Sequence, residues 1–282
     1  MKLNKKTKVL LVLAGMTFMA AAANAAVTSG GNTPNTDLGV SGGSTGDLIL
    51  SVVGNQTGTG TAVDLEFDLG LESAFTTNLN LSSTVLAADL NSTFGSAWYT
   101  SGALTWAVVG TTYPKTAGSP KSDTVWATSA ASTAGTSSAF GLFTVNGLAG
   151  SAGTPIKGMD NLLSQAGTAA QGDNVSAAII AQANSNSYTA SEGSTTNSFG
   201  LGQSVDGQLG GASGAQVLDL YQIVGGGANS LLGTFSITSS GSNNATVTFN
   251  AVPEPSTYVM LGLGAFGMYY LARRKRQINF AN

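Results

Sequence analysis

The stretch QVLDLYQI, residues 216–223, lies near the carboxyl end of a chain of 282 residues and is rich in β-branched, aromatic and leucine side chains. Two short runs of the same kind follow it, LLGTFSI at 231–237 and ATVTF at 245–249. A glycine-rich segment and a segment rich in serine and asparagine separate the runs, and these residues favour turns. Three such runs at close spacing predict β-strands joined as an antiparallel meander.

Runs with the same composition occur earlier in the chain. Residues 47–53 are rich in β-branched residues, and residues 62–69 alternate apolar with acidic side chains. We interpret these two runs as paired strands, because turn-forming residues lie between them. The other candidate strands are 104–109, 123–128 and 139–145, and residues 83–90 are a candidate short helix. This pattern predicts an all-β domain over residues 26–251, an antiparallel β-sandwich of about eight to eleven strands.

Residues 157–184 have a different pattern and predict a small helical insertion in the sandwich. Apolar side chains recur at helical spacing in its first half, and the pattern repeats after Gly172. We therefore expect one or two short helices here. The repeated positions are Met159, Leu162, Leu163 and Ala166, and then Val175, Ala178, Ile179 and Gln182. Residues 185–214 contain few apolar anchors, which favours a long loop or short edge strands.

Residues 1–25 have the three parts of a secretory signal peptide. A lysine-rich start precedes an apolar run at 9–22, and Ala23 and Ala25 form a small-x-small cleavage site. This predicts passage through a secretion translocon and cleavage by signal peptidase after Ala25. The alternative is an uncleaved anchor, but the apolar run is shorter than the ~20 residues that span a bilayer.

Composition excludes several kinds of chemistry. The chain contains neither cysteine nor histidine, so disulfides, zinc–thiolate sites and Ser/His/Asp or Cys/His catalytic groups are impossible. Between residues 26 and 252, three lysines face thirteen acidic residues, a net charge of about −10. An acidic surface repels phosphate backbones, so nucleic acid is not an expected partner. No nucleotide-binding motif is present, and we expect no cofactor.

Residues 252–276 form a tail with three parts. Pro253, Glu254 and Pro255 come first, an apolar segment follows at about 257–272, and the basic cluster Arg273, Arg274, Lys275 and Arg276 ends it. The apolar segment predicts a single transmembrane helix, with the cations kept on the cytoplasmic side and the domain outside. The alternative, a buried carboxyl-terminal helix, would place four consecutive cations at the end of an apolar helix.

This tail resembles the PEP-CTERM sorting signal of exported proteins in Gram-negative bacteria, in all three parts and in their order. The resemblance covers under a tenth of the chain and implies only how the protein is routed. It implies that an exosortase, a membrane protease, cuts at or near Pro253–Pro255. The protein would pass through an inner-membrane intermediate and reach the cell surface or the extracellular matrix, often beside exopolysaccharide.

Candidate binding and catalytic residues within the domain are few. Asp64, Glu66 and Asp68 alternate along one predicted strand, and such a row of carboxylates can hold Ca²⁺. Its other interpretation is the solvated face of a half-buried strand. The same carboxylates, with Glu72, are the candidates for glycoside hydrolysis, although sequence spacing cannot set the separation that this reaction needs.

Aromatic residues are the remaining candidates. Trp98, Tyr99 and Trp126 flank polar loops and suit either sugar stacking or ordinary packing, whereas Trp106 lies in an apolar strand and is expected in the core. We therefore expect a non-enzymatic exported protein with a structural or adhesive role, associated with exopolysaccharide or biofilm. The alternatives are a secreted carbohydrate-active enzyme that uses Asp and Glu, and a surface protein permanently anchored in the membrane.

Overall fold

The computed structural model of the chain describes residues 47–71, 75–112, 124–170, 177–239 and 244–252. The predicted signal peptide at 1–25, the sorting residues 253–255, the transmembrane segment at 257–272 and the basic cluster 273–276 lie outside these residues. Within the part of the chain that is described, no helix is both long enough and apolar enough to cross a membrane.

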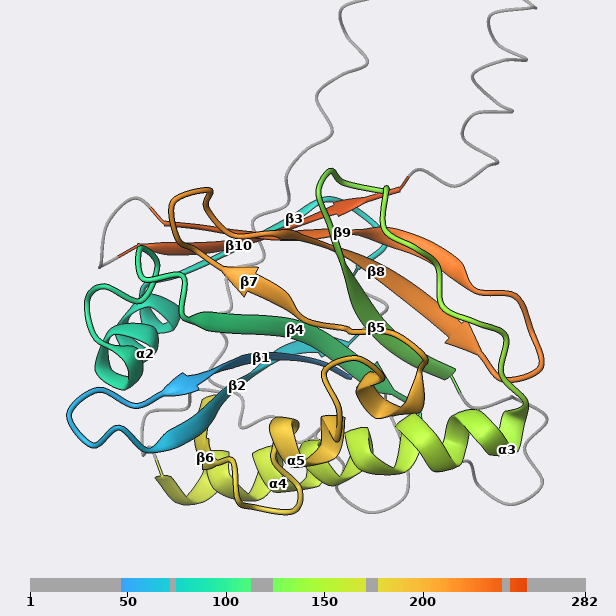
Figure 1. The fold of residues 1–282 in the computed structure, drawn as a ribbon, viewed down its shortest axis with the longest axis horizontal. Helices are drawn as coiled ribbons and strands as arrows, with labels where there is room; N and C mark the ends of the chain where they lie inside the picture. Colours follow the sequence, from blue (N-terminus) through green and yellow to red (C-terminus); the bar gives the residue numbers. More distant parts are fainter. Residues whose placement is uncertain (1–46, 72–74, 113–123, 171–176, 240–243, 253–282) are drawn as a thin grey trace, which may run out of the picture.

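Ten strands form one antiparallel sheet in the described residues (Figure 1). They are paired in the order β3-β10-β9-β8-β5-β4-β1-β2-β6, and β7 pairs with β4. The strands are β1 (Asp47–Asn55), β2 (Ala62–Leu71), β3 (Leu79–Ser83), β4 (Leu104–Thr111), β5 (Thr124–Ala131), β6 (Ala177–Ala181), β7 (Gly207–Leu209), β8 (Val217–Val224), β9 (Ser230–Ser239) and β10 (Ala245–Ala251).

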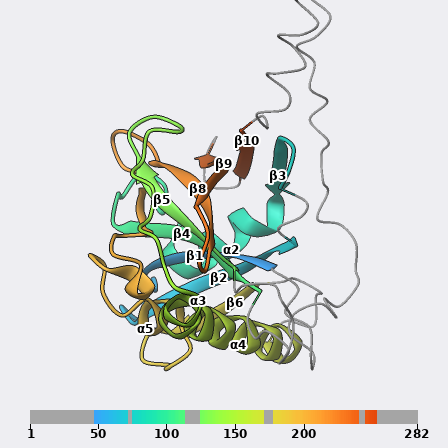
Figure 2. The same ribbon diagram turned by 90° about the vertical axis from the view of Figure 1, so that its right-hand side faces the viewer.

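Short helices make up the rest of the regular structure. They are α2 (Thr84–Phe94), α3 (Val145–Leu148), the π-helical turn η2 (Ala149–Gly153), α4 (Thr154–Ala170), α5 (Tyr188–Glu192) and the 3₁₀ turn η3 (Ser198–Gly200). The predicted β-rich class with a small helical part is confirmed. The two separate sheets of a sandwich are not found, because one sheet curls until β8, β9 and β10 lie above β1, β2 and β4 (Figures 1 and 2).

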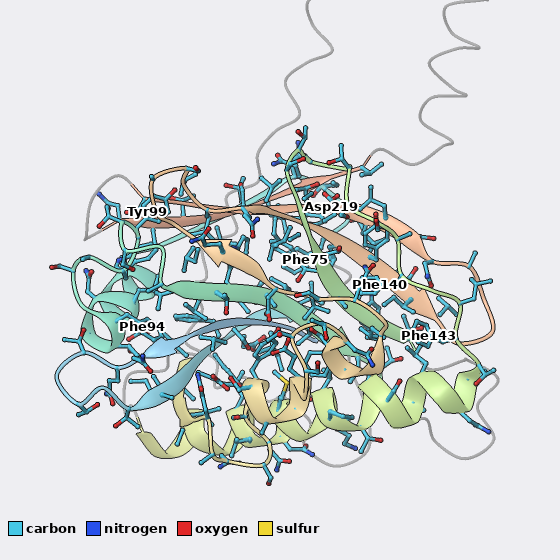
Figure 3. All side chains as sticks on the ribbon, in the orientation of Figure 1. Phe75, Phe94, Tyr99, Phe140, Phe143 and Asp219 are labelled. Carbon is cyan, nitrogen blue, oxygen red and sulfur yellow. The ribbon has the colours of Figure 1, made fainter. Side chains whose placement is uncertain are left out.

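The inner face of the curled sheet encloses the first hydrophobic core. Alternate residues of β1, β2, β4, β8, β9 and β10 point into it, and α2 packs its apolar side against it. Phe75 lies there (Figure 3) and forms a T-shaped pair with Phe249, with ring centroids 5.3 Å apart. Trp98, Trp106 and Trp126 also lie in this core and are at most 2% exposed. The core position expected for Trp106 is therefore confirmed.

The outer face of the sheet carries a second core, under the helices. Ile49 of β1, Val109 of β4 and Ile223 of β8 point to this side. They are covered by apolar residues of η2, α4 and α5 and of the segment around η3, including Met159 and Tyr188. Figures 1 and 2 show α4 lying across this face. The middle strands are thus buried on both faces, which explains why β4 is almost continuously apolar.

The predicted strands and helices are confirmed where their period was clear. The meander of β8, β9 and β10, the β1–β2 pair and the strands β4 and β5 all form. The candidate helix at 83–90 is α2, and the first half of the insertion is α4, although this helix begins at Thr154 rather than 157. Residues 185–214 contain α5, η3 and the short strand β7.

Two predictions are wrong. Residues 139–145 form no strand; the chain is irregular up to Thr144, which caps α3 through its side chain. The second predicted helix, at 175–182, is instead the edge strand β6, which pairs with β2. Ala178 and Ile180 face the second core while Ile179 is 44% exposed, so the true period is two. A short apolar run fits both the helical period of 3.6 and the strand period of two. The pairing with β2 makes this segment a strand.

Gly210 provides a test of the packing between the segments before β4 and after β7. Its φ is +75°, and a Cβ atom placed on it would overlap the carbonyl oxygen of Tyr99. Gly58 has a similar φ of +85° with nothing within 4 Å. We expect Gly210→Ala to lower the free energy of unfolding by about 2–3 kcal/mol, because strain and overlap add, and Gly58→Ala by only about 1 kcal/mol. Urea unfolding followed by tryptophan fluorescence measures both values, and equal losses would contradict the contact with Tyr99.

Candidate functional site

The acidic side chains of β2 do not lie on a solvated face. Val63, Leu65 and Phe67 point into the first core, as expected, so Asp64 and Glu66 point to the outer face. There they lie beneath α5 and are completely buried, at 0% exposure each, whereas Asp68 is partly buried. The prediction of a solvated row is therefore wrong for Asp64 and Glu66, because a segment more than 120 residues further along the chain covers this end of β2.

Asp64 and Glu66 bind the first turn of α5. The backbone N–H of Tyr188 donates to Glu66 Oε1 at 2.9 Å, and that of Thr189 donates to Asp64 Oδ2 at 2.7 Å. The Thr189 hydroxyl also donates to Asp64 Oδ1, at 2.7 Å. The Ala190 N–H donates to the side chain of Ser187, the N-cap. Side-chain oxygens from β2 and the N-cap thus satisfy the amides that a helix leaves free at its start.

A second pair of carboxyl groups lies beside the first. The Tyr188 hydroxyl donates to Asp206 Oδ1, and Glu192 lies close enough for its charge to act on Asp206. Glu192 accepts a hydrogen bond from the Ser198 hydroxyl at 2.6 Å, and that hydroxyl accepts one from the Val205 N–H at 3.3 Å. We call Asp64, Glu66, Glu192 and Asp206, together with Tyr188, the carboxyl cluster.

The backbone close to the carboxyl cluster is unusual at one position. Phe199 has a φ of +53°, and it is the only non-glycine residue with positive φ in the described ranges. Its ring is 2% exposed and packs edge-on against Tyr188, with centroids 5.6 Å apart. A bulky residue in this conformation costs free energy, so the surrounding contacts must hold it. The strained residue fixes the turn between Glu192 and Asp206.

Burial controls the protonation of the carboxyl cluster. Burial, with the Asp64 charge adding to it, raises the pKa of Glu66 to about 8 despite the hydrogen bond from Tyr188. Burial and the charge of Glu192 raise the pKa of Asp206 to about 8. Burial also raises the pKa of Tyr188 well above its usual value. Lys157 on α4 is the only basic residue in the ranges that the structure describes, so few charges oppose these shifts.

This arrangement does not fit the calcium site considered from the sequence. Among the described residues, no group of three or more acidic side chains can hold a metal ion, and Asp64 already accepts hydrogen bonds on both oxygens. Of the carboxylates considered for glycoside hydrolysis, Glu72 lies outside the described residues, and Asp64 and Glu66 are buried beneath α5. Their hydrogen bonds from Tyr188 and Thr189 position α5.

Sequence reasoning missed the partners of β2. Tyr188, Glu192 and Asp206 come from a polar segment without periodicity, and only the tertiary fold brings them to Asp64 and Glu66. One signal was available in the sequence. Asp64 and Glu66 alternate with apolar residues in β2, and this pattern singled out the two carboxylates without indicating their partners. The aromatic candidates for sugar stacking, Trp98 and Trp126, are buried, at 1% and 2% exposure, so packing is the correct interpretation for both; Tyr99 packs edge-on against Trp98.

The last described strand runs up to the predicted sorting tail. Strand β10 runs to Ala251, and the N–H of Val252 donates to the carbonyl of Leu232 at 2.8 Å. Regular backbone pairing thus continues to the residue before Pro253, further than the strand predicted to end at 249.

Comparison with known proteins identifies this tail. The family model of the PEP-CTERM protein-sorting motif matches residues 251–276. The motif implies that the protein is exported and sorted by an exosortase. Sorting of this kind suggests an exported protein of Gram-negative bacteria. No curated protein and no solved structure matches the chain.

Proposed function

We propose that this chain, which the PEP-CTERM motif marks as an exosortase-sorted exported protein, is a non-enzymatic structural or adhesive component of the cell surface or extracellular matrix. The motif at 251–276 is the observation that carries the proposal. In this proposal the chain is held briefly in the inner membrane, cut near Pro253–Pro255 and released. Signal peptidase and the translocon act on residues 1–25 before that step.

Features of the domain support a passive role outside the cell. Residues 26–252 contain only three basic residues and no cysteine or histidine. Glu66 and Asp206, the acids whose pKa values are raised to about 8, belong to the carboxyl cluster. Both accept hydrogen bonds from Tyr188 of the same chain. An acidic protein rich in small polar residues remains soluble outside the cell, and its partner there is a neutral polysaccharide rather than nucleic acid.

Processing by exosortase tests the routing. Coexpression with an exosortase is expected to remove the tail and lower the mass of the chain that lacks its signal peptide by about 3 kDa. Replacing Pro253, Glu254 and Pro255 by alanine should abolish the shift, because the protease loses its recognition segment. Asn250→Ala, an exposed change just upstream of the motif, is the matched control and should leave processing intact. An unchanged mass with active exosortase would favour a permanent anchor.

A binding assay tests the adhesive role separately. The processed protein is expected to bind neutral polysaccharide on a glycan array without releasing reducing sugar. Release of reducing sugar that is lost in the Asp64→Asn and Glu66→Gln variants would instead favour the enzyme. Failure to bind any glycan would contradict the adhesive role but leave the processing result standing.

A further inference from the structure

Residues 182–206, which we call the latch segment, cover β2 at Asp64 and Glu66, on the outer face of the sheet. Hydrogen bonds to carboxyl groups help to hold the segment there. Glu66 and Asp64 accept the amides of Tyr188 and Thr189, and Asp206 accepts the hydroxyl of Tyr188. Tyr188, Phe199 and the apolar residues near them pack onto the second core from this segment. The latch segment is therefore attached both by apolar packing and by bonds whose strength depends on protons.

Two acids of this contact, Asp206 and Glu66, favour their protonated forms. Burial and the nearby charge of Glu192 raise the pKa of Asp206, whose Oδ1 accepts the Tyr188 hydroxyl. Glu66 is 0% exposed, and its Oε2 atom has no hydrogen-bond partner. An ionised carboxylate in that position would be buried and half unpaired, so the neutral acid fits the site.

Little positive charge is available to balance these groups. Asp64 lies on the same strand as Glu66, Tyr188 and Glu192 lie on α5, and Asp206 follows η3. The helix α4 packs against both α5 and β2 and contributes Lys157 and Asp160. Loss of both protons leaves four carboxylates close together, with the single lysine of α4 as the only cation in the described residues.

We propose that the latch segment is a proton-controlled cover, closed on β2 when Glu66 and Asp206 hold their protons and released as the pH rises. Release frees the amides of Tyr188 and Thr189 and uncovers apolar residues of the second core. The exported domain then offers a new apolar surface whose availability depends on the acidity around the cell.

The sign of the effect follows from the two states. In the closed state the pKa values of Glu66 and Asp206 are about 8. When the latch segment is released, Glu66 on β2 and Asp206 in the segment both meet water, and their pKa values return to about 4. The closed state is therefore fully favoured below pH 4 and loses its advantage as the pH rises towards 8. Each group changes the opening equilibrium by up to about tenfold per pH unit in this window.

Hydrogen exchange in the purified full chain tests the proposal. The amides of Tyr188, Thr189 and Ala190 are compared with that of Val247 on β10, after correction for the intrinsic pH dependence of exchange. Between pH 6 and 8 we expect opening at α5 to increase at least tenfold. This opening should be more frequent than that at Val247 and insensitive to low concentrations of urea, because a local release exposes little surface.

Three variants sharpen the result. Glu66→Gln and Asp206→Asn replace each acid by a neutral side chain of similar shape, and should reduce the pH dependence of α5 exchange. Asp89→Asn on α2 is the control, which removes one carboxylate from outside the cluster and should behave as the natural chain. If a variant does not fold, the carbon-13 titration of the Glu66 carboxyl in the natural chain replaces it, with a midpoint expected near 8.

Two outcomes would overturn the proposal. In the first, corrected exchange at α5 does not change between pH 6 and 8, or changes equally in all variants, so that the cluster does not control opening. In the second, the α5 amides exchange at the same rate and with the same urea dependence as Val247, which shows that only global unfolding exposes them.

Discussion

Asp219→Ala is expected to lower the free energy of unfolding by about 3–5 kcal/mol. The change removes a buried carboxylate that accepts three hydrogen bonds, and it leaves the three donors without a partner. Asp219 lies on β8 and is 0% exposed. Its Oδ1 accepts hydrogen bonds from the Gly135 N–H at 2.7 Å and the Thr234 hydroxyl at 2.8 Å. Its Oδ2 accepts one from the Ser137 N–H at 2.9 Å. Figure 3 shows the residue beside the segment that follows β5.

Asp219 differs from the carboxyl cluster in the direction of its pKa shift. Burial alone would raise the pKa of Asp219, but the hydrogen bonds from Gly135, Ser137 and Thr234 outweigh it and lower the pKa. A lowered pKa means that the ionised form stabilises the fold above the unfolded value near 4, and that this contribution is lost as the pH falls through the folded value. Asp219→Ala should therefore be least harmful in acid.

Urea unfolding at pH 7 and pH 3 measures this prediction. Asp219→Asn, which keeps one carbonyl acceptor, should lose less than the alanine variant. Thr136→Ala is the control; this exposed residue lies in the same segment and bonds only locally, to Thr133, so we expect a loss below about 1 kcal/mol. A loss for Asp219→Ala that is equally small would show that the segment is not anchored through this carboxylate.

Glu66→Gln is expected to stabilise the domain at pH 8, by about 2–4 kcal/mol relative to the natural chain at the same pH. In the natural chain the unfolded state loses the Glu66 proton near pH 4.5 and the folded state only near 8, so each pH unit between these values costs up to about 1.4 kcal/mol. Glutamine has no proton to lose and avoids this cost, while its side-chain oxygen can still accept the Tyr188 N–H.

The comparison at two pH values separates ionisation from packing. At pH 4 both proteins carry a neutral side chain at position 66, so their free energies of unfolding should agree within about 1 kcal/mol. The three buried tryptophans report unfolding by fluorescence at both pH values. If Glu66→Gln is less stable by the same amount at pH 4 and pH 8, then Glu66 is not held neutral in the folded protein and the prediction fails.

Together, Asp219 and Glu66 predict a stability that declines in both directions from mildly acidic pH. Protonation of Asp219 weakens the fold on the acid side, and ionisation of Glu66 and Asp206 weakens it on the alkaline side. Lys157 is the only cation in the described residues. The buried carboxyl groups are therefore stabilised by hydrogen bonds, as at Asp219, or by protonation, as at Glu66, and both depend on pH.

The sequence predicted strands well where each strand carried its own signal. The runs at 216–223, 231–237 and 245–249 have turn formers on either side, and their pairing is local. The continuous curled sheet was not predictable in this way, because β5 joins β4 to β8 across a long stretch of chain. The strand β6 was mistaken for a helix because five apolar residues fit both periods, and only β2 beside it decides.

The carboxyl cluster shows the same limit at a site. Asp64 and Glu66 were identified as unusual from their alternation, yet the solvated face assigned to them required that nothing cover β2. Residues 182–206 contain little to indicate burial, and their contact with β2 depends on Tyr188 and Thr189 donating to Glu66 and Asp64, more than 120 residues earlier in the chain. Long-range polar contacts of this kind leave no periodic pattern in the sequence.

The position of β10 has a mechanical consequence for a protein held by its carboxyl end. β10 is an interior strand that pairs with β9 over residues 245–251 and with β3 over 245–249. A pull transmitted along the strand through Pro253 loads both ladders in shear, so many hydrogen bonds must break at once. An edge strand in the same place would peel away one bond at a time. Under the proposed routing, in which the membrane holds the tail, the domain therefore hangs from an interior strand with both ladders loaded in shear.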